Sequence, residues 1–235
     1  MSRYRGWGAA ALAVAALCTL CVPSISSAST GVANVAHTLS SSSAASTERA
    51  AAMAREMSVS ERASTVVMGH VAGTDPAALR AYMESGLGGF ILMGANIPAS
   101  ESELQTLTSA LTVDPALPPL IAVDQEGGLV SRLNGDAYPA STSLKGLPVA
   151  DTSAAFLARG SLVARAGITV NFGTVADQTD DPGSFIHGRA LGTDPTGAAE
   201  RVAAATTAQE QFVGSTLKHF PGHGAAPGDS HHAIP

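Results

Sequence analysis

The segment KHFPGHGAAPGDSHH, residues 218–232, holds four of the seven histidines in a chain of 235 residues, together with one lysine and one aspartate. Histidine suits general acid/base catalysis because its ordinary pKa lies near neutrality. Clustered His and Asp side chains also suit a metal ion. A loop rich in Gly and Pro can carry histidines simply because it is solvated. The spacing of the side chains and the elements that hold them must separate these three interpretations.

The spacing is unfavourable for a metal site. His219 and His223 are four residues apart, which would place them on one face of a helix, but Pro221 and Gly222 lie between them and interrupt any helix. No Glu follows the first His, so the zinc-hydrolase motif is missing. We therefore expect no metal and no cofactor, although ligands carried by the loop remain an open alternative.

The spacing is favourable for proton transfer. In the triplet Asp229-Ser230-His231 a carboxylate lies two residues from an imidazole, close enough to orient the ring and raise its basicity. The Gly- and Pro-rich loop suits a group that must swing over a bound substrate. From these residues alone, catalysis and a merely solvated loop are both open.

Short apolar runs predict the strands that position this segment. GGFILMG (88–94) and PPLIAVDQEGG (118–128) are continuous apolar stretches, typical of strands buried on both faces. The other predicted strands are 63–71, 167–177 and 214–220. Helical patterns separate them, two with an Asp-Pro start: Asp75-Pro76 and Asp194-Pro195.

Such alternation requires a parallel sheet with helices outside it. Polar residues gather where the predicted strands end: Asn96, Asp124 to Glu126, Asp177, Lys218 and His219. In a (β/α)8 barrel this end of the strands is the active-site face. We predict an α/β fold of the TIM-barrel type with about the first five of its eight βα units in this chain. A doubly wound open sheet is the alternative, but no Gly-rich phosphate loop follows the first strand.

The N-terminal residues resemble an export signal. Arg3 and Arg5 precede an apolar stretch, and small residues offer a cleavage site after Ala28, so we expect a signal peptide over 1–28. A single membrane anchor is the alternative. Leu precedes both cysteines, Cys18 and Cys21, where a lipoprotein would have a small residue.

The predicted signal contains both cysteines, so the exported chain would have neither a disulfide nor a thiolate nucleophile. Residues 29–50 are rich in Ser and Ala, which predicts a flexible tether before a folded domain over 51–235. The formal charge is −6, and loss of the signal would make it more negative. We therefore expect a secreted or cell-envelope protein that binds neither nucleic acid nor, once the signal is cleaved, a membrane.

Two stretches together resemble a known family. PLIAVDQEGGLVSRL (119–133) and KHFPGHGAAPGDSH (218–231) are similar to motifs of glycoside hydrolase family 3, in particular its bacterial β-N-acetylhexosaminidase branch. The likeness extends from about residue 55 to 235, and the Asp-Ser-His loop separates this branch from the family's β-glucosidases. The resemblance implies a retaining glycosidase that removes terminal N-acetylglucosamine.

The resemblance also implies roles for individual residues. His231 would be the acid/base, polarised by Asp229, and Asp124 would bind sugar hydroxyls. The residues expected to hydrogen-bond the sugar or its N-acetyl group are Arg132, Arg189, Lys218 and His219. The expected partner is a small oligosaccharide or a muropeptide, from cell-wall fragments or chitin oligomers. The few aromatic residues fit a pocket for one sugar better than a groove for a long polysaccharide.

The sequence departs from the family at two points. The family's nucleophilic aspartate would lie beyond Pro235, and Leu129 stands where the family commonly has Arg. We therefore expect a chain ending at Pro235 to be inactive and to fold poorly. The alternatives are a non-catalytic or vestigial sugar-binding protein, a family 3 β-glucosidase, and a metal-dependent hydrolase.

Overall fold

The computed structural model describes residues 45–226 and 228–232. The predicted signal peptide and most of the predicted tether lie outside these residues. The chain divides into two units, Met1–Glu56 and Met57–Pro235. In the first, residues 45–56 are helical, so the end of the segment predicted as a flexible tether is a helix. Its Ala, Arg, Glu and Met residues are strong helix formers, which explains the difference.

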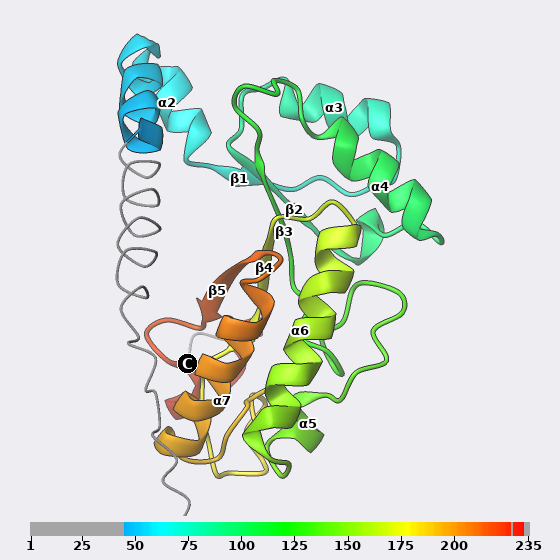
Figure 1. The fold of residues 1–235 in the computed structure, drawn as a ribbon, viewed down its shortest axis with the longest axis vertical. Helices are drawn as coiled ribbons and strands as arrows, with labels where there is room; N and C mark the ends of the chain where they lie inside the picture. Colours follow the sequence, from blue (N-terminus) through cyan, green and yellow to red (C-terminus); the bar gives the residue numbers. More distant parts are fainter. Residues whose placement is uncertain (1–44, 227, 233–235) are drawn as a thin grey trace, which may run out of the picture. The chain divides into compact units, whose positions relative to one another are not determined.

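The second unit is built on a parallel sheet whose strands are neighbours in chain order (Figure 1). The strands are β1 Met68–Gly69, β2 Gly89–Leu92, β3 Leu120–Val123, β4 Val170–Val175 and β5 Gly214–Lys218. Each pair is parallel, with Phe90 opposite Ile121 and Val175 opposite Lys218 as examples of the register. The predicted α/β class with a parallel sheet is confirmed.

Helices precede, connect and follow these strands. They are α2 Val59–Thr65, α3 Pro76–Met83, α4 Glu101–Ala110, α5 Ser141–Leu144, α6 Val149–Arg165 and α7 Pro195–Gln209, with 3-10 turns η1 Gly94–Asn96 and η2 His223–Ala225. The two Asp-Pro helix starts are confirmed, because Asp75 and Asp194 each accept backbone N–H bonds of the first turn. Within the described residues no helix is long and apolar enough to cross a membrane.

Each of the five strands is shorter than the stretch predicted for it, and two of the differences have a clear local cause. The strand predicted over 63–71 is mostly wrong: a capping box between Ser58 and Glu61 starts a helix that runs to Thr65, and only Met68–Gly69 are strand. The strand predicted over 118–128 ends at Val123. Gly127 and Gly128 have φ of +84° and +72°, so the chain turns there and folds back over the strand end.

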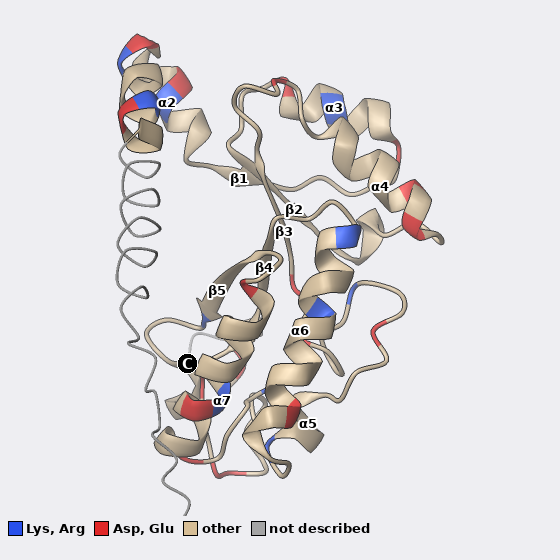
Figure 2. Ribbon diagram, in the orientation of Figure 1, with Lys and Arg blue, Asp and Glu red and all other residues tan. Residues whose placement is uncertain are grey.

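The sheet is fixed by apolar packing against the helices. One core cluster joins β2 and β3 to α3, α4 and α6, and it includes Leu104 and Leu107 of α4 and Leu111, which caps that helix. A second cluster lies between α6 and α7, which run side by side in Figure 1. β1 to β4 carry no charged residue, and the charges are scattered over the helices and loops (Figure 2). The charged side chains at the carboxyl ends of β3, β4 and β5 therefore stand next to an otherwise uncharged part of the sheet.

Candidate active site

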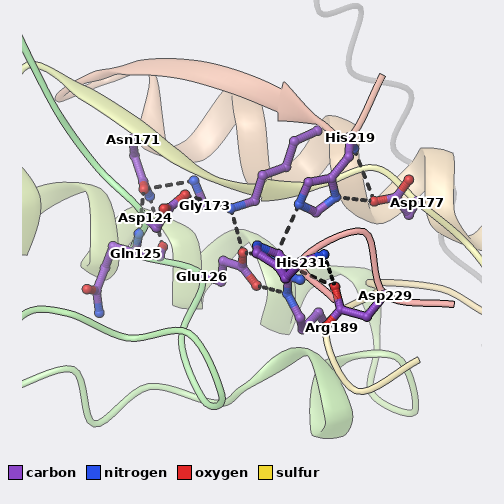
Figure 3. Close-up of polar contacts among 11 residues, drawn as sticks. Asp124, Gln125, Glu126, Asn171, Gly173, Asp177, Arg189, His219, Asp229 and His231 are labelled. Carbon is purple, nitrogen blue, oxygen red and sulfur yellow. Dashed lines mark hydrogen bonds and ion pairs between the residues drawn. The ribbon is translucent and has the colours of Figure 1, made fainter. Parts of the chain in front are cut away.

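The carboxyl ends of β3, β4 and β5 bring together polar side chains that are far apart in the sequence (Figure 3). Asp124 follows β3, Asp177 lies two residues after β4, and Lys218 ends β5. Because parallel neighbouring strands end at one edge of the sheet, their following residues meet there. Four of the predicted sugar-binding residues are joined by contacts at this edge: Asp124, Arg189, Lys218 and His219.

Glu126 is the buried centre of this cluster. Its side chain is 1% exposed, and Arg189 binds both of its carboxylate oxygens, at 2.9 and 2.7 Å. Lys218 Nζ lies 2.5 Å from Glu126 Oε1 and 2.7 Å from Asp124 Oδ1. One buried carboxylate thus holds two cations from separate segments, and we call Asp124, Glu126, Arg189, Lys218, His219 and Asp177 the strand-end cluster.

The contacts of His219 define its tautomer. Arg189 Nη2 lies 3.1 Å from His219 Nε2, and a guanidinium only donates, so Nε2 must be the accepting, unprotonated nitrogen. The ring proton is then on Nδ1, which donates to Asp177 Oδ2 at 2.6 Å. The hydrogen bond from Arg189 to Glu126 raises the pKa of the guanidinium further, so it stays charged. His219 therefore has both ring nitrogens engaged.

Asp177 anchors both His219 and the start of the loop beyond it. Its carboxylate accepts from the backbone N–H of His219 at 3.1 Å and from that of His223 at 2.5 Å, besides the His219 ring. Burial by itself would raise the pKa of Asp177, but the hydrogen bonds from His219 and His223 outweigh it and lower the pKa. Asp177 is therefore ionised at neutral pH and is fully used in holding its neighbours.

The predicted acid/base pair has the expected internal geometry. His231 Nδ1 lies 2.6 Å from Asp229 Oδ1, and the backbone N–H of His231 donates to the same oxygen at 3.0 Å. The backbone hydrogen bond and then the ring contact lower the pKa of Asp229. The His231 side chain is 71% exposed, so the ring is oriented by Asp229 but lies open to solvent. This arrangement leaves Nε2 free to exchange a proton with a ligand.

His223 connects this loop to the cluster. Its backbone N–H is held by Asp177, and its ring Nε2 lies 3.0 Å from Ser230 Oγ, between Asp229 and His231 in sequence. The ring also packs edge-on against Phe185, with centroids 4.3 Å apart. These contacts give His223 a structural role in holding the loop.

Arg132 is the one predicted sugar-binding residue that lies outside the strand-end cluster. Its backbone N–H donates to Gln125 Oε1 at 2.8 Å, and its side-chain Nε is buried without a hydrogen-bond partner in the described part of the chain. A buried donor without a partner is costly, so this nitrogen is suited to a ligand oxygen.

Sequence reasoning missed Glu126 and Asp177 as site residues. Glu126 lies two residues after Asp124. In an extended chain, side chains two residues apart point to the same face, so this spacing was the signal that could have identified Glu126. The sequence marks Asp177 as the end of a predicted strand but gives no sign of its role. Among residues 45–226 and 228–232, no group of three or more His, Cys, Asp or Glu side chains is placed to hold a metal ion.

Comparisons with known proteins point to one family. The family model described as the Glycosyl hydrolase family 3 N terminal domain matches residues 61–235. The Beta-hexosaminidase LpqI of Mycobacterium tuberculosis is 36% identical over 149 residues, which are 59% of this chain and 38% of that protein. A Beta-hexosaminidase of Pseudomonas aeruginosa is 35% identical over 156 residues, covering 63% of this chain and 46% of that protein.

Solved structures agree. A family 3 β-N-acetylglucosaminidase from Paenibacillus sp. str. FPU-7 superposes with a TM-score of 0.70 at 29% identity, over 76% of this chain and 36% of that one. Native NagZ from Neisseria gonorrhoeae gives a TM-score of 0.63 at 27% identity, over 72% of this chain and 53% of that one. The chain thus spans less than half the length of the two curated relatives. The match over residues 61–235, with the strand-end cluster inside it, shows that the chain belongs to glycosyl hydrolase family 3 and carries the family's N-terminal domain.

Proposed function

We propose that the protein hydrolyses terminal β-linked N-acetylglucosamine from cell-wall fragments or chitin oligomers, with retention of anomeric configuration, and that this domain forms the first part of a TIM barrel. The observation that carries the proposal is the Asp229–His231 pair, which exposes an oriented imidazole on a loop anchored to the strand-end cluster by His223. The names of the relatives, β-hexosaminidases in several bacteria, support this substrate class.

The strand-end cluster would bind the sugar. Asp124, only partly buried, offers carboxylate oxygens to sugar hydroxyls, and Lys218 offers its one remaining N–H. Glu126 and Asp177 are buried and saturated, so their task is to hold Lys218, Arg189 and His219 in place. Preformed donors and acceptors of this kind bind a ligand without paying for their own ordering.

His231 would protonate the leaving oxygen and later deprotonate the attacking water, with Asp229 stabilising the charged imidazolium. A retaining mechanism also needs a carboxylate nucleophile. Asp124, Glu126 and Asp177 are each paired to a cation or a histidine, so we assign the nucleophile to none of them.

The test is an assay of the natural gene product with aryl N-acetyl-β-glucosaminide and aryl β-glucoside. Cleavage of the first, abolished by His231→Ala, would support the proposal. Cleavage of the glucoside alone would make the protein a β-glucosidase. Tight binding of N-acetylglucosamine with no cleavage of either substrate would instead favour a non-catalytic sugar-binding protein.

Export is a further part of the proposal, and the intact mass of the secreted protein tests it. A mass that lacks residues 1–28 would support cleavage after Ala28 and a secreted or cell-envelope location. A mass that includes Met1 to Ala28 would contradict cleavage and favour a membrane anchor.

A further inference from the structure

The side chain of Gln125, a fully buried amide, is flanked in the sequence by two residues of the strand-end cluster. Gln125 sits between Asp124 and Glu126, and its Oε1 accepts from the backbone N–H groups of Arg132 and Leu133, at 2.8 and 2.9 Å. Its Nε2 donates to Ser131 Oγ at 2.7 Å and to Asp136 Oδ2 at 2.6 Å. Both donors and both acceptor positions of the amide are therefore used.

All four of these bonds go to one segment, residues 131–136, and none goes to the cluster itself. The segment is held from the other side by α6, where Arg159 Nε and Nη2 donate to Asp136 at 2.7 and 3.1 Å. Both side chains of this ion pair are buried, at 0% and 1% exposed. The segment is thus tied through Asp136 to a rigid helix and through Gln125 to the end of β3.

The main chain of Gln125 is fixed as firmly as its side chain. Asn171, a buried residue of β4, accepts from the Gln125 N–H at 3.0 Å and donates to the Gln125 carbonyl at 3.0 Å (Figure 3). Gln125 therefore cannot shift without breaking contacts to β4. Because it is fixed, it can define the position of the residues that it holds.

The residue that depends on it is Arg132, whose backbone N–H it binds and whose Nε is buried without a partner among the described residues. We propose that Gln125 is a positioning residue, which acts through the backbone of Arg132 to aim the guanidinium at an oxygen of the bound sugar. This inference rests on the proposed function and on the sugar-binding role that the family resemblance implies for Arg132.

The test compares Gln125→Met, Arg132→Ala and the double variant of the natural gene product in binding N-acetylglucosamine. Met fills a similar volume but makes none of the four hydrogen bonds. We expect Gln125→Met to weaken binding by about 10-fold, which corresponds to the loss of roughly one well-placed hydrogen bond. In the Arg132→Ala background the same change should cost nothing further, since a residue that acts through Arg132 has no effect once the guanidinium is gone. Full additivity of the two losses would overturn the inference.

Thr108→Val is the control for a merely structural effect. Thr108 is also buried, and its hydroxyl donates to the Ala166 carbonyl at 2.8 Å, in the connection that leads from α6 to the start of β4. The Thr108→Val substitution should lower the stability of the protein but leave its affinity for the sugar unchanged. Should Gln125→Met not fold, Gln125→Asn withdraws the amide from the two N–H groups while keeping a polar side chain, and the same comparison applies.

A second readout needs no sugar. The backbone amide protons of Arg132 and Leu133 should exchange with solvent faster in Gln125→Met than in the wild type, and Thr108→Val should leave them unchanged. Unchanged exchange in Gln125→Met would overturn the inference whatever the protein binds. A wild type that fails to bind N-acetylglucosamine would instead sink the proposed function, so the two failures are distinguishable.

Discussion

The domain contains two Asp–His pairs that share their bond geometry and differ in their surroundings. His219 Nδ1 lies 2.6 Å from Asp177 and His231 Nδ1 lies 2.6 Å from Asp229, and in each pair the backbone N–H of the histidine binds the same carboxylate. The His219 side chain is 28% exposed with its Nε2 taken by Arg189, whereas His231 is 71% exposed.

The difference shows that the contact between Asp and His does not by itself define a role. His219 is fixed at both ring nitrogens, so it can bind and position but has no free nitrogen for proton transfer. His231 is fixed at one nitrogen only, on a loop, and its other nitrogen is available. The burial of His219 and its second contact, to Arg189, therefore distinguish a structural Asp–His pair from the exposed pair, which is suited to catalysis.

The largest expected effect is on turnover. His231→Ala in the natural gene product should lower turnover of N-acetyl-β-glucosaminides by about 10²–10⁴-fold, the range for loss of a general acid/base. Steady-state kinetics measures this, and the melting temperature should not change, because the side chain is exposed. Near-wild-type turnover would remove the proposed distinction between the two pairs.

A large effect on stability is expected from the other pair. Asp177→Ala leaves three N–H donors without their acceptor, so the free energy of unfolding should fall by about 3 kcal/mol. Urea unfolding measures it. The matched variant Asp229→Ala should leave the urea midpoint unchanged, and equal losses in the two variants would contradict the comparison.

A smaller effect is expected on sugar affinity. Glu126→Gln keeps the shape of the side chain but removes the charge that holds Arg189 and Lys218, so binding of N-acetylglucosamine should weaken by about 10-fold. Calorimetric titration measures it. Glu101→Gln is the control, because Glu101 forms an exposed ion pair with Arg165 and should contribute little. An equal loss in both variants would mean that the charge of Glu126 has no special role.

The smallest expected effect is on the pH dependence of stability. Hydrogen bonds from His219 and His223 hold the pKa of Asp177 below its ordinary value of 3.8. The unfolded state therefore takes up a proton first as the pH falls below about 3.8, and the stabilisation present above that pH is lost as the pH approaches the lower folded pKa. The free energy of unfolding, measured in urea at pH 5 and at pH 3, should fall less on acidification in Asp177→Asn than in the wild type. An identical loss in both would argue against a depressed pKa.

Much of the framework could be predicted from the sequence because its signals are local. The Asp-Pro helix starts and the apolar run of β2 need only neighbouring residues. The proximity of Asp124 and Lys218, which are 94 residues apart in the sequence, could also be predicted, because neighbouring parallel strands end at one edge of the sheet. The failure at 63–71 has a local cause as well, since the capping box at Ser58 outweighs a short β-branched run.

The contacts that decide the roles could not be predicted. Arg189 lies in a loop without regular structure. Nothing in its position in the sequence indicates that it binds Glu126 or donates a hydrogen bond to Nε2 of His219. Burial of Glu126 and exposure of His231 depend on how the 127–133 and 222–232 segments fold back. Such contacts arise from packing between distant segments, which no local pattern encodes.

The measurement that tests the central distinction most directly is the leaving-group dependence of His231→Ala. The dinitrophenolate of a dinitrophenyl N-acetyl-β-glucosaminide departs without protonation, whereas a leaving group of high pKa needs a general acid. We expect kcat/KM of His231→Ala to remain near wild type for the first substrate and to fall by about 10²–10⁴-fold for the second. An equal loss on both substrates would show that His231 binds or positions the sugar rather than transferring a proton, and the assignment of the exposed pair to catalysis would be wrong.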